Sequence, residues 1–344
     1  MKTFMKTAFI GSVTFAGLAF APAAFAEDSL EIRDFIGSIN WSNGPMSVEV
    51  EKNKGDTKVS GRSDVTVDGG FDKIDGSDCK SSYGSYDFDW FGKKKEGRFG
   101  GFDDLDDLPV LNITMPRDAK LVIRNSVVFT DGNPNIGEAD LELRHCGSVT
   151  LGDIENTLAL DSRGSANVTV GQTGQIAASL KGSGDLSGGN SGDVLVKSRG
   201  SGDVELGNLA SLEISLHGSG DLEASDVSGP VEMTSHGSGD AELNNVEGSL
   251  TYSGHGSGDL EVSSVEGPEL YLKSHGSGDI DVGGGDVEEL EIIVRGSATV
   301  EYSGDAENAN LSASGSGDIR VDRVSGVAEI RTSGSGDIDI DERG

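Results

Sequence analysis

Apolar and polar residues alternate along most of the chain, in short runs separated by glycines. Apolar residues stand at every second position from Leu212 to Leu216, and the alternation resumes after the next glycines at Leu222. This period of two is typical of a β-strand with one buried face and one face in water. No long helical pattern follows the first 26 residues, so the chain is predicted to be all-β.

The glycines between the runs belong to an internal repeat. The pair Gly-Ser, usually extended to Gly-Ser-Gly-Asp, recurs eleven times at intervals of 17 to 20 residues. A second turn signal, such as Asp-Val-Ser-Gly-Pro from Asp226, divides the repeat into two strands. One such unit cannot bury its own apolar face, whereas stacked units can. We therefore predict a single-chain parallel β-solenoid, or β-helix, with 17–20-residue coils and about eleven regular coils. The copies begin at Gly147, Gly164, Gly182, Gly200, Gly218, Gly237, Gly256, Gly276, Gly296, Gly315 and Gly334.

The polar residues of this Gly-Ser-Gly-Asp marker should form columns along the outside of the solenoid. If a strand runs straight through the marker, its glycines point inward, where the opposite walls of a thin solenoid come close. The residue before the first glycine, the serine and the aspartate then point outward. The first column contains Arg163, Lys181, Arg199, His217, His236, His255, His275 and Arg295. The aspartate column contains Asp185, Asp203, Asp221, Asp240, Asp259, Asp279, Asp318 and Asp337.

These columns admit two interpretations. Stacked imidazoles suit a transition metal such as Zn²⁺, and a row of carboxylates suits Ca²⁺. The candidate metal ligands are His217, His236, His255, His275, Asp221, Asp240, Asp259 and Asp279. Alternatively, short Asp and Ser side chains bond to nearby backbone amides, and the columns only stabilise stacked strands. We favour the second interpretation and expect no cofactor, with Ca²⁺ or Zn²⁺ as the alternative.

Catalysis is not expected. A Ser-His-Asp triad needs the histidine between the other two residues, but in the marker the serine lies in the middle. A catalytic site is also built once, whereas this pattern recurs in coil after coil. We therefore predict a protein that is not an enzyme, with a carbohydrate-active β-helix enzyme as a minor alternative.

The N-terminal third is less regular. We assign residues 27–145 to irregular coils and residues 146–344 to the regular repeats. An inserted loop at 71–108 holds eight of the 14 aromatic residues that follow residue 26. It is either a simple insertion or a recognition loop, because aromatic and basic side chains carry much of the energy of binding. Its candidate binding residues are Tyr83, Tyr86, Trp90, Phe91, Lys93, Lys94 and Lys95.

The first 26 residues have the features of a cleavable signal peptide, with two lysines, an apolar stretch and Ala24-Phe25-Ala26 at the end. Cys79 and Cys146 are a candidate disulfide in the oxidising compartment that export implies. Removing Lys2 and Lys6 changes the net charge from -32 to -34, which disfavours nucleic acid and anionic membranes. We expect a monomer without a membrane span, located in the periplasm, on the cell surface or in the medium.

The repeated Ser-Gly-Ser-Gly-Asp and His-Gly-Ser-Gly-Asp motifs, with the opening segment Leu-Glu-Ile-Arg-Asp-Phe-Ile-Gly-Ser-Ile-Asn-Trp, resemble the head GIN domain family of putative auto-transporter adhesins. The resemblance implies a parallel β-helix in an exported, often surface-related protein, and it supplies no catalytic residues. We therefore expect an exported, non-enzymatic adhesin or envelope-associated interaction protein. Its partner would be a protein or a glycan at the cell envelope, and a cation-binding solenoid is the alternative function.

Overall fold

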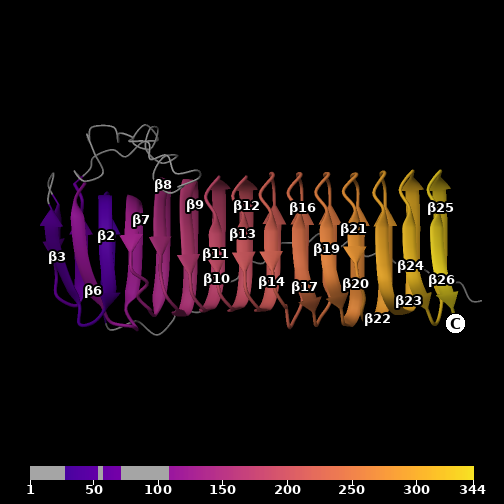
Figure 1. The fold of residues 1–344 in the computed structure, drawn as a ribbon, viewed down its shortest axis with the longest axis horizontal. Coiled ribbons are helices and arrows are strands. Elements are labelled where there is room, and N and C mark those ends of the chain that lie inside the picture. The colour runs from indigo at the N-terminus through magenta and orange to yellow at the C-terminus, as the bar shows by residue number, and fades with distance from the viewer. Residues whose placement is uncertain (1–27, 53–56, 71–107) are drawn as a thin grey trace, which may run out of the picture.

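Strands of successive coils lie side by side along one long stack (Figure 1). The computed structural model describes residues 28–52, 57–70 and 108–344. The described residues contain no helix, and 69% of them lie in strands that are wound into about 12 turns. The predicted parallel β-solenoid is therefore confirmed.

Each coil contributes one strand to each of two walls. The first wall contains, in stacking order, β5 (Asp64–Asp68), β1 (Ser29–Arg33), β7 (Lys120–Asp131), β8 (Glu138–Thr150), β9 (Ile154–Val170), β10 (Thr173–Gly182), β12 (Ser191–Gly200), β14 (Leu209–Leu216), β16 (Val231–Ser235), β18 (Leu250–Gly254), β20 (Gly267–Ser274), β22 (Asp286–Val294), β23 (Val300–Gly315) and β25 (Ala328–Gly334). The long strands β7, β8, β9 and β23 bend around a corner and take part in both walls.

The second wall includes the remaining halves of these long strands. Its other members are β6 (Val110–Met115), β2 (Ile36–Asn43), β11 (Leu186–Gly188), β13 (Val204–Leu206), β15 (Leu222–Ala224), β17 (Ala241–Val246), β19 (Leu260–Val265), β21 (Ile280–Val282), β24 (Ile319–Val324) and β26 (Ile338–Arg343). We call the turn from the first wall to the second the marker corner, because it holds the Gly-Ser-Gly-Asp motif. The turn back to the next coil is the second corner.

The core forms because inward residues of one coil stack on those of the next. On β14, Leu212, Ile214 and Leu216 are all buried. In register on β16, Leu212 meets Val231 and Ile214 meets Met233. Repetition of this match gives one continuous apolar core along the solenoid.

The marker glycines have a different purpose from the one expected. The marker is a turn between strands: β14 ends at Leu216 and β15 begins at Leu222. A Cβ atom on Gly218 would lie 1.8 Å from the carbonyl oxygen of Gly200 in the preceding coil, and one on Gly220 would lie 2.1 Å from that of Gly202. The close approach that requires glycine is therefore to the neighbouring coil, and the expectation that it is to the opposite wall is wrong.

The first copy of the marker is also out of register with the others. His145, not Gly147, pairs with Gly164, and Gly147 pairs with Ala166. His145 has a positive φ of 68°, a conformation that also occurs at Asp34 and Asn125 in earlier coils. The irregular coils therefore turn this corner with other residues in the left-handed region, which short polar side chains tolerate best.

The N-terminal end is built out of sequence order. The coil of β1 and β2 lies between β7 on one side and the later strands β5 and β6 on the other. Beyond these, β3 (Ser47–Lys52) pairs antiparallel with β6, and β4 (Lys58–Ser60) pairs antiparallel with β5. These two antiparallel strands close the end of the stack, where β3 lies outermost (Figure 1). The predicted signal peptide and most of the predicted loop at 71–108 lie outside the described residues.

Candidate functional site

The aspartates of the marker corner form a ladder of hydrogen bonds from coil to coil. The backbone N–H of Asp240 donates to Oδ1 of Asp221 at 2.8 Å, and Oδ1 of Asp240 accepts the N–H of Asp259 at 2.8 Å. The same bond links Asp185 to Asp203, Asp203 to Asp221, Asp259 to Asp279, and Asp318 to Asp337, at 2.8–3.0 Å. In each of these bonds one carboxylate oxygen accepts the amide of the next coil, as expected if the column only stabilises the stacked strands.

The histidines of the marker corner, His217, His236, His255 and His275, form what we call the His column. The first three rings are stacked, with centroids 4.7 and 4.6 Å apart and interplanar angles of 7° and 1°. The fourth ring is turned edge-on to the third at 4.8 Å. The Nδ1 atom of His217 lies 3.3 Å from Oγ of Ser215.

The surroundings of three rings in the His column favour the neutral imidazole. Burial, followed by the charge of neighbouring His236, lowers the pKa of His217, and burial is also the main cause of the lowered pKa of His255 and His275. In the described part of the chain, no group of three or more His, Cys, Asp or Glu side chains is placed to hold a metal ion. Metal binding by the His and Asp columns stays a prediction.

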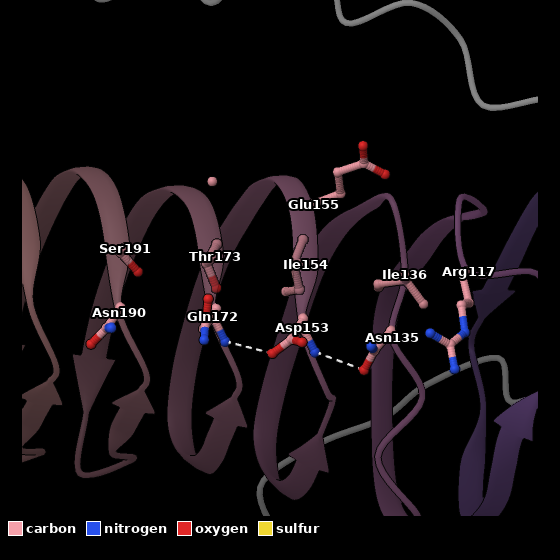
Figure 2. Close-up of a pocket in the computed structure, with 11 residues that line it drawn as sticks. Arg117, Asn135, Ile136, Asp153, Ile154, Glu155, Gln172, Thr173, Asn190 and Ser191 are labelled. Atoms are coloured by element: carbon pink, nitrogen blue, oxygen red, sulfur yellow. Dashed lines mark hydrogen bonds between the residues drawn. The ribbon is translucent and has the colours of Figure 1, made fainter.

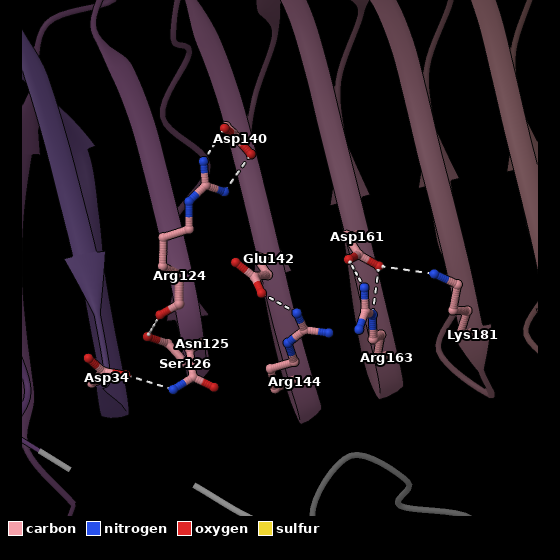
Figure 3. Close-up of polar contacts among 10 residues, drawn as sticks. All are labelled: Asp34, Arg124, Asn125, Ser126, Asp140, Glu142, Arg144, Asp161, Arg163 and Lys181. Carbon is pink, nitrogen blue, oxygen red and sulfur yellow. Dashed lines mark hydrogen bonds and ion pairs between the residues drawn. The ribbon is translucent and has the colours of Figure 1, made fainter. Parts of the chain in front are cut away.

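Toward the N-terminus the same corner carries ion pairs instead of imidazoles (Figure 3). Arg124 donates to Asp140 through both terminal nitrogens of its guanidinium, Nη1 and Nη2, and Arg144 pairs with Glu142. Asp161 accepts from Arg163 at 2.8 Å and lies 3.8 Å from Nζ of Lys181. Burial is the largest single effect and would raise the pKa of Asp161, but the hydrogen bond from Arg163 and the positive charges of Arg163 and Lys181 together lower it. Such half-exposed pairs contribute about 0–1 kcal/mol each, so this surface is a stabilised scaffold.

The second corner carries another ladder of hydrogen bonds, at positions that were predicted only to form turns. Oδ1 of Asn43 accepts the N–H of Asn135 at 2.9 Å, and Oδ1 of Asn135 accepts the N–H of Asp153 at 3.0 Å. Asp153 accepts the N–H of Gln172 at 2.9 Å, and Asn190 in turn accepts that of Asn208. The signal was present in the sequence, because Asn or Asp recurs at this position in most coils, usually one residue before an apolar position.

A groove of about 570 Å³ runs along this second corner (Figure 2). Its rim holds Arg117 at one end, followed by one polar residue from each of four further coils. Its floor is formed by the residues that follow these in the chain. The rim residues after Arg117 are Asn135, Asp153, Gln172 and Asn190, and the floor residues are Ile136, Ile154, Thr173 and Ser191.

Comparison with known proteins identifies the family. A family model described as putative auto-transporter adhesin, head GIN domain, matches residues 117–264 and 249–344. The chain belongs to this family. No curated protein matches the chain. The family description indicates an adhesin-like protein that is exported or located at the cell surface, and no helix in the described ranges is both long and apolar enough to cross a bilayer.

Several predicted residues of this family member lie outside the described ranges. They are the candidate binding residues Tyr83, Tyr86, Trp90, Phe91, Lys93, Lys94 and Lys95. Cys79 is also outside, whereas Cys146 is fully buried and is not a free thiol. The recognition loop and the Cys79–Cys146 disulfide stay predictions.

Proposed function

We propose that the chain is an exported, non-enzymatic adhesin that binds a protein or glycan at the cell envelope through the sides of its solenoid. The observation that carries this proposal is membership of the head GIN domain adhesin family over residues 117–344. The first 26 residues supply the signal for export, and the long stack of coils presents a side surface that extends over many repeats.

The arrangement of polar groups supports binding better than catalysis. In both ladders the same hydrogen bond recurs from coil to coil, as in the bonds from Asp221 to Asp240 and from Asn135 to Asp153. Catalytic groups instead converge on one reacting atom and differ in their roles. A repeated surface suits contacts spread over many coils, where each contact is weak and their number gives affinity.

The test is binding of fluorescently labelled mature protein, residues 27–344, to intact cells and to isolated envelope fractions of the producing organism. We expect saturable binding that excess unlabelled protein displaces. If the protein binds saturably neither to intact cells nor to any of the envelope fractions, the adhesin function is refuted. Release of soluble sugar from envelope polysaccharide, abolished by a single substitution, would instead show an enzyme.

A further inference from the structure

The floor of the second-corner groove interrupts a column that is apolar in the coils on either side of it. This column stacks one residue from each coil, and its first two members are Ile136 and Ile154. Thr173 and Ser191 follow in register, and then Leu209 and Val227 restore the apolar pattern. Packing alone would favour apolar residues throughout, because stacked apolar side chains are what hold the coils together. The two hydroxyls therefore stand where the fold does not require them.

One of these hydroxyls lacks a partner. Oγ of Ser191 is buried and makes no hydrogen bond within the described residues. Thr173 is 4% exposed, and its hydroxyl makes only a long bond of 3.4 Å to the carbonyl oxygen of Gly171. An unpartnered buried hydroxyl is destabilising unless something else bonds to it. Both residues line the groove, so a bound molecule with its own hydroxyls is a suitable partner.

The rim above this floor offers further hydrogen-bonding groups. Oδ1 of Asp153 is used by the amide of Gln172, while the side-chain amide of Gln172 makes no hydrogen bond to another described residue. Gly174 lies beside the floor and places no side chain over it. In Figure 2 the polar side chains of Asn135, Asp153 and Gln172 lie in one row that crosses neighbouring coils.

We propose that this groove binds a neutral glycan chain laid along the solenoid axis, a proposal that rests on the adhesin function above. Side-chain amides and hydroxyls both donate and accept hydrogen bonds, as each sugar hydroxyl does, so they can pair with a sugar without any charged group. From Arg117 to Asn190 the groove crosses five coils, or four spacings of ~4.8 Å, about 19 Å in all. An elongated oligosaccharide fits this shape.

Other ligand classes fit less well. A polyanion would be repelled by Asp153 and Glu155 and by the net charge of -32. A peptide strand could not add to the sheet, because the groove coils already pair with each other: the N–H of Thr173 donates to the carbonyl of Asn190, and that of Ser191 to Asn208. Recognition must then come from side chains, which favours a ligand rich in hydroxyls.

The test is an array of neutral oligosaccharides of glucose, galactose, mannose and N-acetylglucosamine, printed beside sulfated and uronic-acid oligosaccharides and probed with the mature protein. Two variants address the groove: Ser191→Leu, which continues the column as Leu209 does, and Gln172→Ala, which removes a rim amide. Glu205→Ala is the control, because Glu205 is exposed on β13 and lies outside the groove. Circular dichroism and melting establish that each variant is folded.

We expect binding of at least one neutral oligosaccharide, weakened at least tenfold in both groove variants and unchanged in the control. Binding confined to acidic oligosaccharides, binding that neither groove variant weakens, or no binding at all would overturn the proposal. Wild-type protein that binds envelope fractions but no neutral oligosaccharide refutes only the groove. Protein that binds neither refutes the adhesin function as well.

Discussion

Replacement of Asp240 separates the hydrogen bond of the aspartate ladder from its charge. Oδ1 of Asp240 accepts the amide of Asp259 at 2.8 Å, and the amide of Asp240 donates to Asp221. Asp240→Asn keeps an acceptor of the same shape and removes the charge. Asp240→Ala removes both and leaves the Asp259 amide to water. The difference between the two variants therefore reports the hydrogen bond alone.

The magnitudes follow from the coil spacing. Two like charges ~4.8 Å apart repel by about 0.9 kcal/mol in water, and salt at 0.15 M, with a Debye length of about 8 Å, reduces this to roughly half. Removing the charge of Asp240 relieves two such repulsions, about 1 kcal/mol in total. The hydrogen bond itself contributes about 1 kcal/mol net. We expect Asp240→Asn to be as stable as the wild type or slightly more stable, and Asp240→Ala to be about 1 kcal/mol less stable than Asp240→Asn.

The assay is hydrogen exchange of the peptide that contains Asp259, because a repeat protein need not unfold as one unit. A loss of about 1 kcal/mol corresponds to roughly fivefold faster exchange in Asp240→Ala than in Asp240→Asn. Ser238→Ala in the same marker is the control, since no hydrogen bond of its side chain is present among the described residues. Equal loss of protection in Asp240→Asn and Asp240→Ala would refute the ladder interpretation, because it would mean that the charge, for example through a bound cation, is what stabilises the corner.

Three further predictions test other parts of the fold. Gly220→Ala should lower the unfolding free energy by about 3 kcal/mol or more, because its Cβ would lie 2.1 Å from a carbonyl oxygen. Gly284→Ala should be tolerated, because the nearest atom to its Cβ would be a carbonyl oxygen at 3.9 Å. Equal melting temperatures of the two variants would contradict this prediction. The pKa values of His217, His255 and His275 are lowered, so the folded state binds fewer protons than the unfolded state below about pH 6.5, and stability should fall as the pH drops through that range. Between pH 7.5 and pH 5 the melting temperature should decrease less when all four histidines of the column are replaced by glutamine. An equal decrease in the variant and the wild type would exclude the column as the cause. Tyr302→Phe should lose about 1 kcal/mol in urea unfolding, because the single hydrogen of the buried hydroxyl is shared between the carbonyl oxygens of Gly285 at 2.9 Å and Asp305 at 3.1 Å. An unchanged midpoint would show that this hydrogen bond contributes nothing net.

The regular coils could be predicted from the sequence because each rule acts locally and repeats. Alternation fixes which face of a strand is buried, so the inward positions of Leu212, Ile214 and Leu216 follow directly. The outward direction of His217 and Asp221 also agrees with the structure, in which both are exposed. The reason expected for the marker glycines was wrong because it assumed that a strand runs straight through the marker. The marker is a turn instead, and a Cβ atom there would point along the axis, toward the neighbouring coil.

The N-terminal coils could not be predicted in the same way. The pairing of β1 with both β5 and β7 joins segments that are far apart in the chain, and alternation carries no information about which strand is the neighbour. The shift that places His145 opposite Gly164 has a similar cause, because a histidine with positive φ replaces the glycine that the pattern relies on. The groove was missed for another reason: it depends on Thr173 and Ser191, which on their own are ordinary strand residues.

Residues that depart from a repeat are therefore more informative about function than those that obey it. The aspartates and glycines of the marker recur because each coil must bond to and fit against the next, and their contacts account for them. Thr173, Ser191 and Gln172 break the pattern of their columns without a structural gain, since the apolar floor and the ladder of the second corner are both weakened there. A stacked fold tolerates such a loss in one place, because neighbouring coils supply the remaining stability. A loss of packing that persists in adjacent coils, around one groove, is the observation on which the glycan proposal rests, because a ligand would supply the partner that Oγ of Ser191 lacks.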